Sequence, residues 1–187
     1  IEWKQLGGQS VTPHIYGNNF HLSIPKELKT ATADMAFIVA PPAQARQIRP
    51  ILNASLLERL PVYSISKVYS GTPNPDLDAK LEEVRFVDMP WVLAPDETAV
   101  QLQAALLTSW PAEMNQYKRL YALGVDAYYA LLQLQELNQH WQGQTGYLSV
   151  DKMGVISRNQ LLWAHFVNGE PQLLGEPLPE ELLPDEN

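Results

Sequence analysis

The side chains that most often catalyse reactions are few in this sequence and lie far apart. The four histidines are His14, His21, His140 and His165. No two of them share one helical turn, as a pair of metal ligands on a helix would. The nucleotide-binding patterns Gly-x-x-x-x-Gly-Lys-Ser/Thr and Gly-x-Gly-x-x-Gly and the nucleophile pattern Gly-x-Ser-x-Gly are missing. There is no cysteine either. We therefore expect no catalytic residue, no metal and no cofactor.

The acidic residues give no stronger signal of a site. Residues 151–154 read DKMG, but an EF-hand calcium loop needs alternating oxygen ligands and a distal Glu. We predict a plain Asp/Gly turn there. The pairs Asp76/Asp78 and Glu82/Glu83 lie beside turn-forming residues, and we interpret them as solvated. His165 alternates with Ala164 and Phe166, which predicts a half-buried or surface residue of a strand.

Asp126 is a charge inside an apolar helical pattern, and two interpretations of it stay open. Either it is exposed or paired locally, with Arg119 among its helical neighbours, or it is a charge at the rim of a cleft. Aromatic residues are frequent, with five tryptophans and eight tyrosines in 187 residues. Some must fill the core, whereas Trp91, which follows Pro90, is a candidate interface anchor.

Composition excludes several classes of partner. The chain has 13 basic and 21 acidic residues, a net charge of −8, which disfavours binding to nucleic acid and to anionic lipid surfaces. A hydrophobic fraction of 45% is enough for a core. No apolar run reaches the ~18 residues of a membrane helix. Because the sequence begins at Ile1 without a signal peptide, we expect a processed chain or an excised piece, with any targeting signal upstream.

The first half of the sequence alternates strands with helices. The apolar run at 34–40 predicts a strand buried on both faces, and the helical spacing that follows Pro41 and Pro42 predicts a helix that Pro50 bends or ends early. Residues 60–68 predict a second strand, which completes a βαβ unit. Residues 84–91 predict a third strand, broken by Pro90.

The second half predicts two helices and then a β-meander. The helices cover 95–109, with Asp96 and Glu97 in the first turn, and 113–140, whose apolar pattern predicts burial on more than one side. Residues 145–175 contain short strands and tight turns, and Asn168-Gly169 is a strong two-residue hairpin signal. The tail at 176–187 is acidic and proline-rich, which favours an extended or disordered segment.

The order of these segments resembles the closing half of a type I periplasmic solute-binding protein. The stretches that carry the likeness are VDMPW, RLYALGVDAYYAL and TGYLSVDKMGVISRNQLLWAHFVNGEP. The resemblance implies an α/β fold in which 1–90 belongs to the second lobe and the helices of 91–144 return to the first. Residues 145–175 would then make the final crossover and the β-meander of the second lobe, and 176–187 the acidic tail.

Three stretches resemble the LppC/LpoA family more closely. They are ADMAFIVAPPAQARQIRPIL, RLYALGVDAYY and LLWAHFVNGEP, and the likeness extends over about residues 3–175. Members are outer-membrane lipoproteins that activate a class A penicillin-binding protein, a peptidoglycan synthase. The resemblance implies a non-enzymatic regulator at the periplasmic face of the outer membrane, anchored through an upstream lipid. Alternatives are a solute-binding or sensor domain for an amino acid or peptide, and, more remotely, an α/β enzyme.

The resemblance also suggests where a site would lie. Ligands of open α/β sheets bind at the carboxyl ends of the strands, which in this sequence are 40–41, 66–67 and 89–91. Amino-acid-binding relatives commonly place an acidic residue where this chain has Lys67, which favours docking over amino-acid binding. Our candidates for the cleft or docking rim are Ser66, Lys67, Trp91, Tyr121 and Asp126.

The two long helices would normally pack on the first lobe's sheet, most of which this sequence lacks. Large apolar stripes are rarely left in water. We therefore expect these helices to pair with a second chain, which would make a homo-oligomer, or to fold back onto the sheet formed by 35–88.

Overall fold

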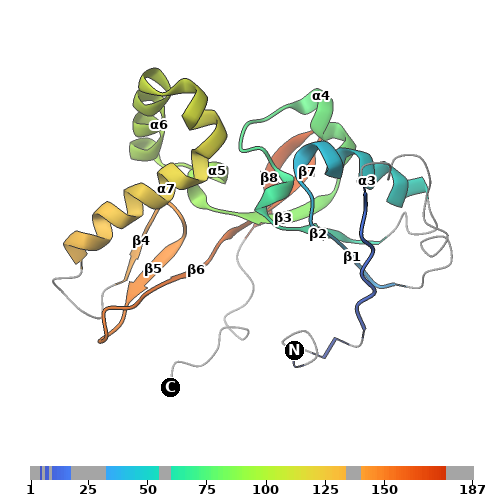
Figure 1. The fold of residues 1–187 in the computed structure, drawn as a ribbon, viewed down its shortest axis with the longest axis horizontal. Coiled ribbons are helices and arrows are strands. Elements are labelled where there is room, and N and C mark those ends of the chain that lie inside the picture. The colour runs from blue at the N-terminus through green and yellow to red at the C-terminus, as the bar shows by residue number, and fades with distance from the viewer. Residues whose placement is uncertain are drawn as a thin grey trace.

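The computed structural model describes residues 5, 7–8, 10–17, 33–54, 60–133 and 140–175. In Figure 1, a larger sheet with α3 and α4 occupies one side of the molecule, and α6, α7 and a small sheet occupy the other. In chain order the elements are β1 (Ala36–Ile38), α3 (Pro42–Ala54), β2 (Val62–Ser64), η2 (Ser66–Val68), α4 (Pro75–Asp78), η3 (Ala79–Leu81), β3 (Val84–Asp88), α5 (Pro90–Leu93), α6 (Glu97–Ser109), α7 (Pro111–Gln133), β4 (His140–Gln142), β5 (Tyr147–Val150), β6 (Ile156–Asn159), β7 (Leu162–Val167) and β8 (Glu170–Leu173).

The larger sheet has five strands in the order β1-β2-β3-β7-β8. The first three strands are parallel to one another, β7 pairs antiparallel with β3, and β8 pairs antiparallel with β7. The predicted strand–helix–strand unit and the third strand are thereby confirmed. Burial of the first strand on both faces is wrong, because Phe37 is 56% exposed, and the third strand ends at Asp88, before Pro90 begins α5. The second strand is shorter than expected, because it ends at Ser64 and residues 66–68 turn into the 3-10 helix η2.

One face of this sheet forms the main core. Along β3, Val84 and Phe86 are fully buried and alternate with half-buried neighbours, and Phe86 stacks on Phe166 of β7 with ring centroids 5.0 Å apart. Helix α3 contributes Ile48 and Leu52 to the same cluster. Pro50 lies within α3, which continues to Ala54, so the expected early end of the helix is wrong. Burial of Leu52 beyond the proline stabilises the last helical turn.

The second group of elements surrounds α7. Helices α6 and α7 pack on each other around Trp91, Ala99, Met114 and Ala122. As predicted, α6 has Asp96 at its start, where the side chain accepts a hydrogen bond of 2.7 Å from Ala99 N. The predicted extent of the second helix is wrong at its end, because His140 already belongs to strand β4; residues 134–139 lie outside the described part.

The predicted meander is divided between two sheets. Strands β4, β5 and β6 form a three-stranded antiparallel sheet. Its β5–β6 turn is the one expected at 151–154: Asp151 Oδ1 accepts hydrogen bonds of 2.8 Å from the backbone N–H groups of Met153 and Val155. Only β7 and β8 return to the larger sheet. The acidic tail at 176–187 lies outside the described residues, as does His21.

The expected two-residue hairpin joins β7 to β8 and rests against α4. Asn168 and Gly169 have φ values of 52° and 78°, as a type I′ turn requires, and Val167 pairs with Glu170 across the turn. A Cβ atom on Gly169 would lie 2.2 Å from Pro75 O. Glycine is therefore required here both for the backbone conformation and for the close approach of Pro75.

The Gly169→Ala variant should separate these two requirements when it is compared with Gly154→Ala. Gly154 has nearly the same φ, 76°, but its Cβ position is open. Gly154→Ala should therefore cost only the left-handed strain, roughly 1–2 kcal/mol, whereas Gly169→Ala should cost at least ~1 kcal/mol more. Chemical denaturation measures both values. Equal losses would contradict a steric role for Pro75.

Candidate functional site

The carboxyl ends of β2 and β3 meet an ion pair whose carboxylate is buried and whose arginine is half-buried. Asp88, the last residue of β3, is 1% exposed, and Arg119 of α7 donates to both of its carboxylate oxygens, with Nε 3.0 Å from Oδ1 and 3.2 Å from Oδ2. A salt bridge from Arg119 Nη2 to Oδ2 completes a fork-like contact. An arginine of the helix therefore neutralises the carboxylate at the end of the central strand.

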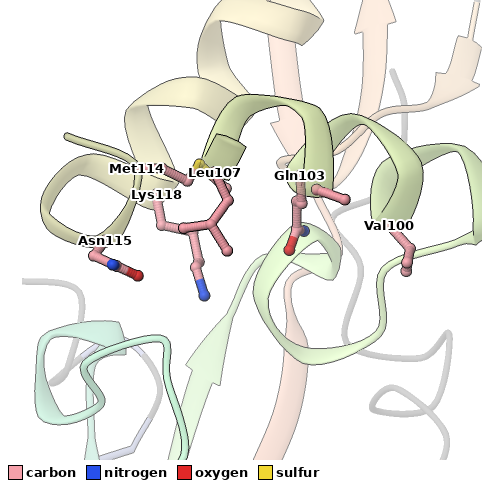
Figure 2. A pocket seen from close by; sticks show the side chains of 7 residues that line it. Val100, Gln103, Leu107, Met114, Asn115 and Lys118 are labelled. Atoms are coloured by element: carbon pink, nitrogen blue, oxygen red, sulfur yellow. The ribbon is translucent and has the colours of Figure 1, made fainter. Parts of the chain in front are cut away.

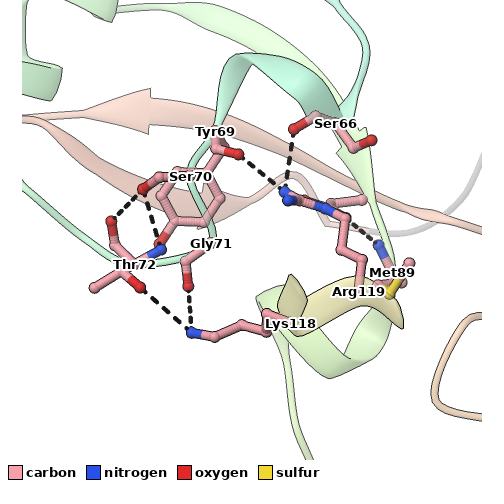
Figure 3. A network of polar contacts seen from close by, with 9 residues as sticks. Ser66, Tyr69, Ser70, Gly71, Thr72, Met89, Lys118 and Arg119 are labelled. Atoms are coloured by element: carbon pink, nitrogen blue, oxygen red, sulfur yellow. Dashed lines mark hydrogen bonds and ion pairs between the residues drawn. The ribbon is translucent and has the colours of Figure 1, made fainter. Parts of the chain in front are cut away.

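The same guanidinium also binds the backbone that follows the second strand. Arg119 Nη2 donates to Ser66 O at 3.1 Å and to Tyr69 O at 3.0 Å, the two carbonyls that bracket η2 (Figure 3). These bonds satisfy backbone acceptors that have left the β ladder. Burial, with the nearby charges of Asp78 and Asp88, raises the pKa of Tyr69 above its ordinary value. The Tyr69 hydroxyl therefore stays neutral beside the ion pair.

Lys118 binds the loop that follows η2. Its Nζ donates to Gly71 O at 2.6 Å and contacts Thr72 Oγ1 at 3.5 Å (Figure 3). Burial, and to a smaller extent the charge of Arg119, lowers the pKa of Lys118 below its ordinary value. Adjacent basic residues of α7 thus hold the backbone of 66–72, the segment that would line a ligand site at the strand ends.

Asp126 connects α7 to the β4–β5 loop. It is 4% exposed, and its oxygens accept hydrogen bonds of 2.7 Å from Gln144 N, 2.7 Å from Thr145 N and 2.6 Å from Thr145 Oγ1. A Cβ on Gly143 would lie 2.9 Å from either oxygen. The carboxylate is therefore enclosed by the loop that it organises. The interpretation of an exposed or locally paired aspartate is therefore wrong, whereas a place at the rim of a cleft or docking surface stays a prediction.

The five predicted rim residues do not gather at one surface. Trp91 is 1% exposed, so it fills the core between α5, α6 and α7 and cannot be an interface anchor in this conformation. Tyr121 is half-buried against the same cluster. Ser66 contributes its carbonyl to Arg119, and Lys67 is exposed. Of the five, Lys67 is the side chain that stands in solvent at the strand ends.

Sequence reasoning did not identify the residues that organise this region, Asp88, Lys118 and Arg119. For Asp88, the available signal was an aspartate at the end of an apolar strand. Arg119 was assigned to the neighbourhood of Asp126, but it pairs with Asp88. Asp78 was expected to be solvated, yet it is fully buried and accepts a 2.9 Å hydrogen bond from Arg46 Nε.

A shallow hollow of about 250 Å³ lies between α6 and α7 (Figure 2). It is smaller than the ~300–1,000 Å³ typical of small-molecule sites. Its lining side chains do not present a converging set of charges. They are Val100, Gln103, Ala104, Leu107, Met114, Asn115 and Lys118.

Among the described residues, no cluster of three or more His, Asp or Glu is placed to hold a metal ion. In the same part of the chain, no helix has the length and hydropathy to span a membrane.

A family model described as "LppC putative lipoprotein" matches residues 20–169. The chain belongs to the LppC lipoprotein family. It is 28% identical over 214 residues to the penicillin-binding protein activator LpoA of Edwardsiella piscicida, covering 90% of this chain and 30% of that protein. This chain spans 22% and 30% of the lengths of two of the curated relatives that it matches.

Solved structures confirm the predicted α/β fold of the type I periplasmic-binding-protein class. The LpoA C-domain of Haemophilus influenzae, described as a regulator of PBP1A, matches with a TM-score of 0.66 at 24% identity, covering 92% of this chain and 54% of that one. A "putative branched-chain amino acid ABC transporter" from Rhodospirillum rubrum matches with a TM-score of 0.52 at 18% identity, covering 75% and 44%. These two likenesses concern the fold alone.

Arg119→Met should destabilise the protein strongly, because it leaves the buried Asp88 carboxylate without its partner. We expect a loss of about 3–5 kcal/mol in the free energy of unfolding. The exposed control Arg158→Met should change it by less than about 0.5 kcal/mol. In a double-mutant cycle, Asp88→Leu combined with Arg119→Met should cost less than the sum of the single variants. Additive losses would argue against coupling between the two side chains.

Asp126→Asn should loosen the β4–β5 loop, because its amide must place an N–H group against one of the donors of Gln144 or Thr145. A cost of about 1–3 kcal/mol is expected, together with faster hydrogen exchange of the Gln144 and Thr145 amides. Asp96→Asn is the matched control, since asparagine caps a helix as well as aspartate does. Unchanged exchange in Asp126→Asn would contradict the assigned role.

Proposed function

We propose that this chain is a non-enzymatic docking part of a periplasmic activator of peptidoglycan synthesis. Its partner would be a class A penicillin-binding protein, and it would act at the periplasmic face of the outer membrane, where an upstream lipid anchors the full-length lipoprotein. The names of its relatives support the partner: they are called penicillin-binding protein activators, and a structural relative is described as a regulator of PBP1A.

The observation that carries the proposal is the filled end of the sheet. In open α/β folds, ligands bind beyond the carboxyl ends of the strands. In this chain Arg119 occupies the ends of β2 and β3, and Lys118 binds the adjoining loop through Gly71 O. These basic groups already donate to protein acceptors. This arrangement favours a fixed surface for another protein over a cleft that closes on a solute.

Activation by such a surface is allosteric. Docking stimulates the synthase only if the contacts are better with its active state than with its inactive state, because a ligand shifts an equilibrium by its difference in affinity. Lys67 is the exposed charge of the predicted rim. We propose that it lies in or beside the docking surface, where a charge governs the rate of association.

The test is a binding titration of this chain, and of a longer version with its upstream region restored, against the periplasmic part of a class A penicillin-binding protein from the same cell. We expect saturable binding by the longer chain and a faster rate of glycan polymerisation by the synthase. Lys67→Glu should weaken binding several-fold. Lys152→Glu, which makes the same charge change in the exposed β5–β6 turn, should not.

Failure of both chains to bind would count against the proposal. A rise in melting temperature with amino acids or peptides, in the absence of synthase binding, would favour the alternative of a solute-binding or sensor domain. Stimulation by a chain whose upstream region alone binds the synthase would place the docking surface outside residues 1–187.

A further inference from the structure

Residues 70–77, which lead from η2 into α4, have little regular structure but are firmly held by their own hydrogen bonds. We call them the η2–α4 segment. The Ser70 hydroxyl donates to Thr72 O at 2.8 Å. Asn74 caps α4, because its side-chain oxygen accepts a hydrogen bond of 3.4 Å from Leu77 N. The segment therefore has one defined conformation rather than that of a free loop.

Neighbouring elements of the larger sheet fix the end of the segment that belongs to α4. Fully buried Asp78 accepts hydrogen bonds of 3.3 Å from Asn74 N and 2.9 Å from Arg46 Nε of α3. The hairpin between β7 and β8 lies against Pro75, whose backbone would collide with a Cβ atom on Gly169. The segment thus lies beside the hairpin that forms the β8 side of the larger sheet, whereas β1 forms the opposite edge.

A lysine of α7 holds the other end of the segment. Helices α6 and α7 lie to one side of the larger sheet in Figure 1, so the expectation that they fold back onto it is wrong, and their pairing with a second chain stays a prediction. From this side, Lys118 Nζ donates to Gly71 O at 2.6 Å and lies 3.5 Å from Thr72 Oγ1 (Figure 3). A Cβ atom on Gly71 would lie 3.4 Å from Lys118 Cδ, so the stem of the lysine also packs against this backbone.

Stability of the fold does not explain a lysine at this position. Burial, and to a smaller extent the charge of Arg119, lowers the pKa of Lys118, so its charged form is less stable in the folded chain than in water. In the described part of the chain, Lys118 forms no salt bridge that would offset this cost. A methionine has a side chain of similar length and no charge to desolvate. The lysine is therefore better explained by the backbone that it holds than by its own burial.

From these contacts we propose that the η2–α4 segment is the part of the docking surface that contacts the penicillin-binding protein, and that Lys118 is the residue that positions it. This inference rests on the function proposed above. The segment starts three positions after Lys67, and Leu77, which is 44% exposed, is its large apolar side chain. A loop that is ordered before binding loses less conformational entropy in the complex. Lys67 then governs the rate of association, whereas the ordered segment prolongs the life of the complex.

Hydrogen exchange in the 187-residue chain tests the positioning role without the synthase. Lys118→Met preserves the apolar stem but removes the ammonium group. The amides of Thr72 and Asn74 should then exchange roughly tenfold faster, as the loss of a hydrogen bond to a charged group predicts, while those of β3 keep their rates. Lys118→Arg retains a donor for the backbone and should restore most of the protection. Lys152→Met, in the exposed β5–β6 turn, should exchange like the original chain. Equal rates in Lys118→Met and the original chain would overturn the positioning role.

Binding to the synthase tests the contact itself, with the longer version of the chain and the periplasmic part of a class A penicillin-binding protein. Lys118→Met should weaken binding about tenfold through loss of order. Leu77→Ala should weaken it by a similar factor through loss of contact, with the hydrogen exchange of Thr72 and Asn74 unchanged. The two substitutions together should weaken binding by less than the product of the single effects, because a disordered segment no longer places Leu77. Lys152→Met should bind like the original chain.

The two proposals fail in different ways. Circular dichroism and the melting temperature establish that every variant is folded. Failure of the original longer chain to bind the synthase would contradict the proposed function, and this inference with it. Binding by the original chain that is not weakened by Lys118→Met or by Leu77→Ala would leave that function in place and overturn this inference, since the docking surface would then lie outside the η2–α4 segment.

Discussion

The ion pair between Asp88 and Arg119 is the contact on which the arrangement of this chain depends. Asp88 lies at the end of the central strand and is almost inaccessible to water, and a carboxylate in that position is costly unless a cation and several donors reach it. Arg119 supplies both, and its Nη2, which also contacts Asp88, binds the carbonyls on either side of η2. One helical side chain thus joins α7 to the end of β3 and to the turn that follows β2.

Asp126, about two turns farther along α7, is a second buried carboxylate that binds a neighbouring segment. It holds the 143–145 loop through two backbone N–H groups and a hydroxyl, and Trp91 N donates to Gln144 O at 3.0 Å from the other side. Helix α7 therefore connects both sheets through buried carboxylates, one on the sheet and one on the helix. A module built in this way presents a fixed surface, which suits recognition of another protein better than closure around a solute.

The sequence was most informative where a local rule decides the structure. Apolar runs located β1 and β3, Asp96 located the start of α6, and Asn168-Gly169 located a hairpin, because capping and turn geometry depend on neighbouring residues. Pro50 shows the limit of such rules, since tertiary burial of Leu52 outweighs the local preference for ending the helix. The resemblance to the LppC/LpoA family, carried by ordered stretches of sequence, gave the fold class that the solved structures confirm.

The sequence was least informative about buried charges and about which polar groups meet. Asp126 and Asp78 read as surface residues because their partners, Thr145 and Arg46, lie 19 and 32 positions away. Trp91 read as an interface anchor because nothing local indicates that α5 is enclosed by α6 and α7. Strand β4 was not predicted, and its first residue, His140, was taken for the end of a helix, because three residues are too few to show an alternating pattern.

The place of β7 in the larger sheet determines the order in which the protein can complete its fold. Strand β3 pairs on one side with β2, close in sequence, and on the other with β7, so that Arg85 faces His165. Pairing β7 with β3 closes a long loop of the chain. This closure costs conformational entropy before the new strand contacts can stabilise the fold, which slows folding. Until residues 162–167 arrive, β3 is an open edge with hydrogen-bonding groups that another chain could bind. The arrival of β7 therefore ends the period in which β3 is most exposed to such contacts.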